Sequence, residues 1–269
     1  MKNKFTISIA LVIVLITIQA CSAGSGAQPT KTIQEATLAE AQSTPSVASI
    51  PTQQTSGVDN NAGPETIDLT SPTLYITTIA PAYTLDVLMN FSGMASNGTT
   101  KEVTLAETEL TQTLPQKEHH FLVVVTGGEG SAESVFIGDQ GYSVFLGTCF
   151  LFSASSSEGQ NAAAGMPKLQ ELITGQAQRV DTGVEVNGFV TDKYELTSEN
   201  MNDKDELSSA FVYVARDGGF ITLYEAQTRT KTDYQGFDPN QLTDVSITFN
   251  FIPVEDGSLV ITIPTVCAN

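Results

Sequence analysis

Two stretches of this 269-residue chain alternate apolar and polar side chains over seven residues each, with Leu88 as the one exception. The apolar positions are Leu85, Val87, Met89 and Phe91 in the first stretch and Val245, Ile247, Phe249 and Phe251 in the second. Successive side chains of a β-strand point to opposite faces, so a period of two predicts strands with one buried face and one solvent face. Any fold of this chain has to bury these two apolar faces.

Further strand-like runs fill most of the chain between and after these stretches. They cover residues 103–110, 119–126, 134–137, 142–146, 179–186, 189–196, 210–215, 220–228 and 259–263. Turn sequences such as Asn187-Gly188 and Asp217-Gly218 separate several of them and supply the positive φ angles that tight hairpins need. Strands joined in this way pair with their neighbours in sequence, so we expect a large antiparallel β-meander.

Helical patterns are few. Residues 166–175 place Leu169, Leu172 and Ile173 on one face of a short helix that begins near a proline and ends at a glycine. A weaker helical pattern covers residues 202–210. One apolar-faced helix beside about ten strands predicts an α+β fold in which the helix covers part of the sheet.

The N-terminus has the pattern of an export signal. Lys2 and Lys4 precede an apolar run at residues 5–18, which is shorter than the roughly 20 residues of a spanning helix. The sequence Ile-Gln-Ala-Cys that ends at Cys21 resembles a bacterial lipobox, so we expect cleavage before Cys21 and acylation of its sulfur with diacylglycerol and palmitate. An ordinary cleaved signal peptide is the alternative. Acylation would hold the protein at the cell membrane or the outer membrane, facing the extracytoplasmic side.

Composition divides the chain into three parts. Residues 1–20 are the expected signal peptide. Residues 21–66 begin with Cys21 and are rich in Ser, Thr, Gln, Ala, Gly and Pro, so they bury too little apolar area to offset the cost of ordering. We expect a disordered tether there, followed by one folded domain at residues 67–269.

Charge and cysteine content restrict the partners. The formal net charge of −18 disfavours nucleic acid, whose phosphates an acidic surface repels. If Cys21 is acylated, Cys149 and Cys267 are the two thiols left in an oxidising compartment, and we expect a disulfide between them. Two free buried thiols are the alternative. We expect no cofactor and no metal, because the two histidines are the strand neighbours His119 and His120.

Motifs of covalent catalysis are missing from the sequence. It holds no G-x-S-x-G, Ser-x-x-Lys, H-E-x-x-H or C-x-x-C pattern. Glu107 and Glu109 share one face of a strand-like run, as the two acids of a glycosidase might, but we interpret them as its solvent face. We therefore predict that the protein is not an enzyme.

Five segments along the chain stand in a definite order: YTLDVLMNFSG (83–93), FIGDQGYSVFLGTC (136–149), VNGFVTDKYEL (186–196), FVYVARDGGFITLYEA (211–226) and LVITIPTVC (259–267). In this order they resemble the bacterial lipoproteins of the LolA/LolB and LppX/LprG superfamily. The resemblance implies an unclosed half-barrel wrapped around a helical lid, with a hydrophobic cavity that carries acyl chains of lipids or lipoproteins. The chain departs from the superfamily in the proline-broken segment before its first strand (66–83) and in having no Trp.

These patterns predict an exported, lipid-anchored binding protein that holds a lipid or another apolar ligand and performs no covalent chemistry. The residues expected to line its concave cavity are Leu85, Val87, Met89, Phe91, Leu169, Leu172, Ile173, Val245, Ile247, Phe249 and Phe251. Core packing is the alternative for each of them. The domain would then be a surface interaction or structural module that meets another envelope protein.

Overall fold

The computed structural model describes residues 62–127, 130–156, 168–200 and 206–268. The expected signal peptide, Cys21 and most of the expected tether lie outside these residues. Residues 62–66, also expected in the tether, contact the sheet, and Thr66 begins its first strand. No helix in the described ranges is long and apolar enough to cross a membrane.

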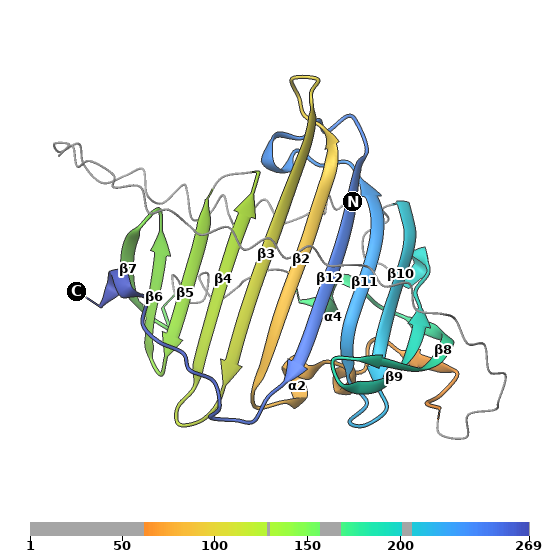
Figure 1. The fold of residues 1–269 in the computed structure, drawn as a ribbon, viewed down its shortest axis with the longest axis horizontal. Coiled ribbons are helices and arrows are strands. Elements are labelled where there is room, and N and C mark those ends of the chain that lie inside the picture. The colour runs from red at the N-terminus through yellow and green to blue at the C-terminus, as the bar shows by residue number, and fades with distance from the viewer. Residues whose placement is uncertain (1–61, 128–129, 157–167, 201–205, 269) are drawn as a thin grey trace.

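One antiparallel sheet of 12 strands dominates the described residues (Figure 1). Its strands are β1 (Thr66–Asp68), β2 (Tyr83–Met94), β3 (Thr100–Gln112), β4 (Glu118–Thr126), β5 (Ser131–Ile137), β6 (Gln140–Phe145), β7 (Thr148–Ser153), β8 (Gln176–Val186), β9 (Phe189–Glu195), β10 (Glu206–Ala215), β11 (Ile221–Thr230) and β12 (Thr243–Pro253). Across the sheet the order is β1-β8-β9-β10-β11-β12-β2-β3-β4-β5-β6-β7. The sheet does not close on itself, which confirms the predicted unclosed half-barrel with little helix.

The described helical segments are all short. There are two α-helical turns, α2 (Ile76–Ile79) and α4 (Leu169–Leu172), and four 3-10 turns, η2 (Pro72–Leu74), η3 (Ser198–Asn200), η4 (Tyr234–Gly236) and η5 (Thr265–Cys267). In Figure 1, α4 lies behind β12 and β11, and α2 lies at the lower ends of the central strands. They cover the face that we call the inner face, where the apolar side chains of β2 and β12 are buried.

The two alternating stretches of the sequence are adjacent strands. β12 pairs antiparallel with β2, and the register sets Phe251 opposite Leu85, Phe249 opposite Val87, Ile247 opposite Met89 and Val245 opposite Phe91. Directly opposed residues of an antiparallel pair lie on the same face, so the two apolar rows form one continuous surface. This surface is the centre of the hydrophobic core.

The predicted meander consists of two runs, β2 to β7 and β8 to β12, which the β12–β2 pairing joins into one sheet. Within each run the hairpins are tight. Between β8 and β9, for example, Val186 pairs with Phe189, and Asn187 and Gly188 take positive φ angles of 53° and 80°. Asn-Gly is the dipeptide that favours this two-residue turn, as the sequence indicated.

The helix expected at residues 166–175 is confined to α4 in the described residues from 168 onward. Ile173 is already extended, and the next residue, Thr174, donates its backbone N–H to the carbonyl of Asn200 (2.7 Å). Gly175 then accepts the N–H of Leu69 (2.7 Å). Backbone hydrogen bonds to the segments that contain Asn200 and Leu69 therefore take the place of the last turn of the expected helix.

The expectation of a helix at residues 202–210 is wrong from Glu206 onward. Residues 206–210 begin β10, and Glu206 and Leu207 pair with Arg229 and Thr228 of β11. Helix propensity is a weak prior, and the ladder with β11 overrides it here. The earlier residues of this prediction lie outside the described ranges.

The strand expected at residues 259–263 is absent from the described structure, and the edge strand β7 was not predicted. Leu259 donates its N–H to Gln112 Oε1 (3.1 Å) and accepts from Gln112 Nε2 (3.0 Å), so a buried side chain satisfies its backbone instead of a strand. β7 has the sequence TCFLFS, whose continuous apolar run gives no alternation to detect.

Cys149 of β7 and Cys267 of η5 form a disulfide, which confirms the expected pairing. η5 contacts both β6 and β7. The bond therefore fastens the C-terminal segment (254–268) to the edge of the sheet, 118 residues along the chain from its partner cysteine. The alternative of two free thiols is excluded.

Candidate functional site

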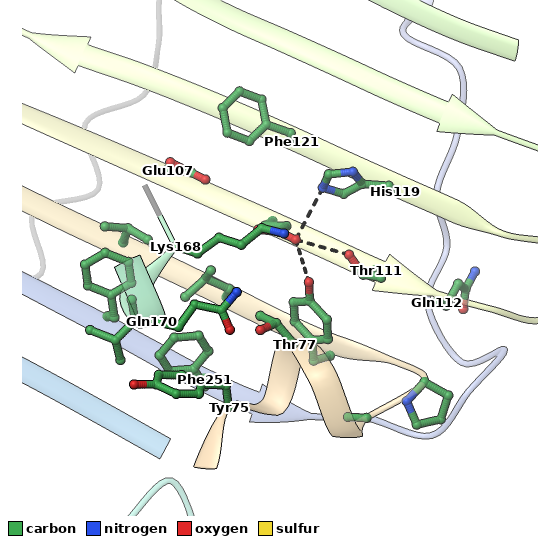
Figure 2. A pocket seen from close by; sticks show the side chains of 18 of the residues that line it. Tyr75, Thr77, Glu107, Thr111, Gln112, His119, Phe121, Lys168, Gln170 and Phe251 are labelled. Carbon is green, nitrogen blue, oxygen red and sulfur yellow. Dashed lines mark hydrogen bonds and ion pairs between the residues drawn. The ribbon is translucent and has the colours of Figure 1, made fainter. Parts of the chain in front are cut away.

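A cavity of about 410 Å³ lies on the inner face, bounded by β2, β3, β4 and β12 and by the segments that carry α2 and α4 (Figure 2). Small-molecule sites in proteins have volumes of about 300–1,000 Å³, so this cavity is large enough for a ligand. Its wall has two parts of different chemistry.

The first part of the wall is apolar. Leu85 and Val87 of β2 and Phe249 and Phe251 of β12 line it, and all four side chains are buried. Tyr75 and Leu169 line the cavity from the segments that cross the inner face. This part follows directly from the alternation of the two paired strands.

The second part of the wall is polar and was not predicted. Glu107 and Glu109 of β3 line the cavity, and the register sets them opposite Val87 and Leu85 of β2. Glu107 is only 3% exposed. The interpretation of both acids as a solvent face is therefore wrong. The sequence held the signal, because Glu107 and Glu109 continue the odd-numbered row of Val103, which is buried on the same face.

Three side chains converge on the Glu109 carboxylate. Tyr83 donates its hydroxyl to Oε1 (2.6 Å), Thr111 donates its hydroxyl to the same atom (3.3 Å), and His119 Nε2 lies 3.4 Å from it. Figure 2 shows His119 and Thr111 directed at this carboxylate from β4 and β3. On its other side His119 stacks on Phe136, with ring centroids 5.8 Å apart.

Burial and hydrogen bonding oppose each other at this carboxylate. Burial favours the neutral form of Glu109, but the His119 imidazole and the Tyr83 and Thr111 hydroxyls outweigh it and place the pKa of Glu109 below its ordinary value of 4.5. Burial, and then the charge on Glu109, raise the pKa of Tyr83. The network therefore holds a carboxylate and a protonated phenol side by side at neutral pH.

The polar wall can accept hydrogen bonds and positive charge from a ligand. Lys117 and Lys168 also line the cavity, but both residues are exposed, whereas Glu107 is buried. No group of three metal-ligating side chains occurs in the described ranges. His119 and His120 face opposite sides of β4, as predicted, and His120 instead contacts Glu133 (3.0 Å).

The structure divides the eleven residues predicted to line the cavity. Those that line it are Leu85, Val87, Leu169, Phe249 and Phe251. Those that do not are Met89, Phe91, Leu172, Ile173, Val245 and Ile247, which belong to the core or pack against it. Phe91, for example, packs on Tyr234 and Phe237, with ring centroids 5.2 and 6.3 Å away. The neighbourhood of η4 therefore fills one end of the inner face.

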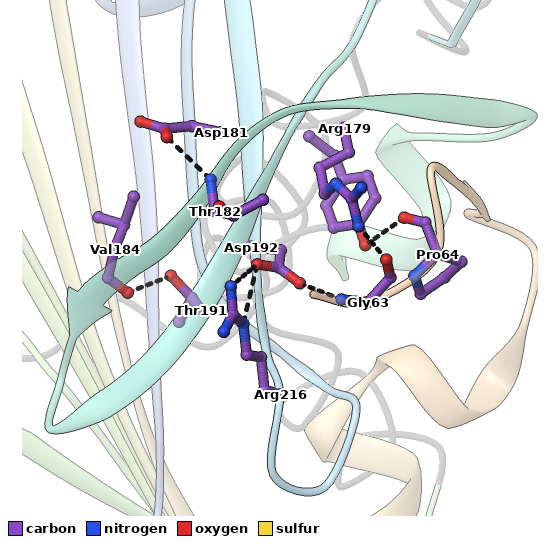
Figure 3. Close-up of polar contacts among 10 residues, drawn as sticks. Gly63, Pro64, Arg179, Asp181, Thr182, Val184, Thr191, Asp192 and Arg216 are labelled. Carbon is purple, nitrogen blue, oxygen red and sulfur yellow. Dashed lines mark hydrogen bonds and ion pairs between the residues drawn. The ribbon is translucent and has the colours of Figure 1, made fainter. Parts of the chain in front are cut away.

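A second buried polar cluster holds the start of the described chain against the sheet (Figure 3). Asp192 of β9 is 1% exposed and accepts hydrogen bonds from Arg216 Nε (2.9 Å) and Nη2 (2.8 Å). Its other oxygen accepts the backbone N–H of Gly63 (2.6 Å). The Gly63 carbonyl accepts from Arg179, and the Pro64 carbonyl from Tyr194 (2.9 Å). We call this cluster the Asp192 clamp; its donors and acceptors bond one another, so its role is structural.

No family model matches this sequence, and no curated protein matches it. Two solved structures show a distant likeness. A DUF1329 family protein from Desulfovibrio piger is 10% identical, with 71% of this chain and 93% of that chain covered and a TM-score of 0.26. A LolA superfamily protein from Nitrosomonas europaea is 9% identical, with 72% and 94% covered and a TM-score of 0.26. Scores at this level carry no inference about a ligand, and the superfamily named from the sequence stays a prediction.

The lowered pKa of Glu109 predicts a pH-dependent contribution to stability. Because the folded state favours the carboxylate, the contribution is fully present above the unfolded pKa, near the ordinary 4.5, and is lost as the pH falls through the lower folded pKa. Carbon-13 NMR titration of the glutamate carboxyls should place Glu109 below 4.5. The stability gap between the wild type and Glu109→Gln should shrink over the same acidic range.

Glu102→Gln is the control for the loss of one negative charge, since Glu102 is exposed on the same strand. A Glu109 resonance that titrates above 4.5 would contradict this account of the network.

The Asp192 clamp predicts that one substitution of a buried residue lowers the stability of the fold strongly. Asp192→Ala removes the carboxylate from a buried pair, and such losses cost about 3–5 kcal/mol. Asp244→Ala is a matched control, because Asp244 pairs with Arg229 (2.6 Å) and both side chains are exposed to solvent. Ion pairs in such positions contribute little to the free energy of unfolding. Urea unfolding of the two variants should show a clear loss of stability for the first only; equal midpoints would show that the clamp is not stabilising.

Proposed function

We propose that this protein is a binding protein that holds an amphipathic ligand in the cavity of its inner face. Such a ligand has an apolar body, as an acyl chain does, and a polar end that donates hydrogen bonds. The observation that carries the proposal is the division of the wall. Leu85, Val87 and Phe251 offer an apolar surface on one side, and Glu107 and Glu109 offer carboxylates on the other.

Because the cavity wall has an apolar part and a polar part, it favours some classes of ligand over others. A wholly apolar body that filled the cavity would set the polar groups of Glu107 and Glu109 against hydrocarbon, and burying polar groups in apolar surroundings is costly. A polar end with N–H or O–H donors offsets that cost, while the apolar body gains from contact with the strand side chains. The ligand chemistry proposed is therefore narrower than the apolar ligand expected from the sequence.

The rival proposal of a solid structural module is weaker on this geometry. The inner face is filled over β10 and β11, where Val212 and Tyr224 are fully buried. It is not filled over β2 to β4, where the cavity lies. The protein would perform no covalent chemistry, since the described wall offers acceptors and donors but no arrangement of nucleophile and base.

The location proposed for this function is the outside of a bacterial membrane, with Cys21 acylated. A binding cavity on a tethered domain can take up an acyl chain near the bilayer and keep it from water. The acylated Cys21, at the start of a tether of some forty residues, would allow the domain to reach beyond the headgroups. Another envelope protein is a possible partner for the exchange of ligand.

Filling the cavity should block ligand binding without unfolding the protein. Thr111→Trp puts a large ring into the cavity from β3 and removes the hydroxyl that donates to Glu109. Thr104→Trp is a matched control, because Thr104 lies on the opposite face of the same strand and donates to Asn90 (2.8 Å). In titrations with the neutral fluorescent amphiphile N-phenyl-1-naphthylamine, the first variant should bind at least about tenfold more weakly and the control about as well as the wild type.

Mass spectrometry of an organic extract of the purified protein identifies any natural ligand. We expect an amphipathic molecule in the extract of the wild type and of Thr104→Trp, and much less of it in the extract of Thr111→Trp. A wild-type protein that neither carries a ligand nor binds the probe would favour the structural module.

Acylation of Cys21 has its own test. When the chain is expressed in a bacterium, the wild type should sediment with membranes and carry the added mass of acyl chains. Cys21→Ser should remain unacylated and leave the membrane fraction, whereas Ser22→Ala, one residue further on, should behave as the wild type. Membrane association of Cys21→Ser in unchanged amount would refute the lipid anchor.

A further inference from the structure

The two edges of the sheet are built differently. At one edge, β8 carries Arg179, Asp181 and Glu185, and its pairing with β9 shifts register twice, between residues 179 and 181 and between 182 and 184. β1 covers only residues 176–178 of it. Charges, irregular register and short covering strands are the means by which proteins keep a sheet edge from pairing with another chain.

The opposite edge, β7, lacks these charges and register shifts, although η5 contacts it. Its six residues, TCFLFS, are uncharged and contain no proline, and they pair with β6 in an unbroken register from Gln140–Ser153 to Phe145–Thr148. No described strand pairs with its outer side. Leu151 is 69% exposed and Phe150 is 48% exposed, on opposite faces of the strand. An uncharged apolar edge in regular register is a template for strand pairing.

Charge distribution favours this edge as the place where two acidic molecules can meet. The chain has a formal net charge of −18, so two copies repel each other over most of their surface. Residues 140–156 contain no charged side chain, and neither do residues 257–268, whose η5 turn the disulfide fastens beside β7. The β7 edge and η5 thus form one uncharged region, with further exposed apolar side chains at Leu146 and Val266.

A disulfide and a ring contact hold this edge in place, which lowers the cost of pairing. The disulfide of Cys149 holds β7 from one side. On the other side the Phe152 ring lies over Gly141 of β6, so closely that a Cβ at Gly141 would collide with it. Phe152 also packs against Phe136 of β5 (5.6 Å between centroids).

We propose that β7 is a dimer interface, at which it pairs antiparallel with β7 of a second copy of this chain. A two-fold axis perpendicular to the sheet relates the copies, because only this axis pairs a strand antiparallel with itself in one sheet. It keeps the inner faces of both copies on the same side. The protected edge at β8 prevents growth beyond two copies, so the assembly is a closed dimer of 24 described strands.

Analytical ultracentrifugation of the full-length chain in a density-matched detergent tests the interface. The wild type should sediment as a dimer that dissociates on dilution. Leu151→Lys and Phe150→Lys each place a charge at the edge and should raise the dimer dissociation constant about tenfold or more. Val180→Lys is the matched control: Val180 is 50% exposed on β8, at the protected edge, and its substitution should leave the dimer unchanged.

Hydrogen exchange of the β7 amides distinguishes the second copy from other covers of this edge. In the wild type, protection of these amides should increase with protein concentration, and in Leu151→Lys it should not. A wild type that is monomeric at every concentration overturns the proposal, whether its β7 amides exchange freely or are protected by another segment of the chain. A dimer that survives both lysine variants overturns it as well, because the contact then lies elsewhere.

Discussion

The pairing of β12 with β2 is the constraint on which the rest of this structure depends. It joins strands that are about 160 residues apart in sequence, and it turns two separate meanders into one sheet. Without it, each meander would expose an apolar strand at its edge, Val87 and Met89 in one and Phe249 in the other. The cavity depends on the same pairing, since its apolar wall comes from both strands. Such non-local contacts form late because the loop between them must be closed first.

What the sequence could predict follows from how local each signal is. The alternation at Leu85–Phe91 and Val245–Phe251, and the turn at Asn187-Gly188, depend on neighbouring residues and identified strands and hairpins correctly. The adjacency of β2 and β12 carried no local signal. Residues 259–263 have strand-like composition, but the buried amide of Gln112, far away in sequence, satisfies Leu259 and leaves the segment irregular.

The candidate site was predictable in its apolar half only. Leu85, Val87, Phe249 and Phe251 were named because apolar alternation marks a buried face. Glu107 and Glu109 were assigned to solvent because acids usually are, although their odd-numbered positions on β3 placed them in the buried row. Position in a strand was thus the better guide than residue type. The buried acids that interrupt the apolar row mark the place where the inner face stops serving as core and lines a cavity.

An open sheet of this width needs something other than hydrophobic burial to hold its ends. Burial is extensive from β10 through β11 and β12 to β2, and it is low at both ends, where β8 has one buried residue and β7 has none. At one end the Asp192 clamp fixes the segment leading into β1, and at the other the disulfide of Cys149 fixes β7. The clamp and the disulfide both lie near the ends of the sheet, where the outer strands bury little apolar area. Ionic and covalent bonds therefore stabilise the ends of the sheet in place of hydrophobic packing. The clamped end can then remain a protected edge, while the disulfide end carries no charge on β7, and an uncharged edge in regular register is the kind that pairs with another strand.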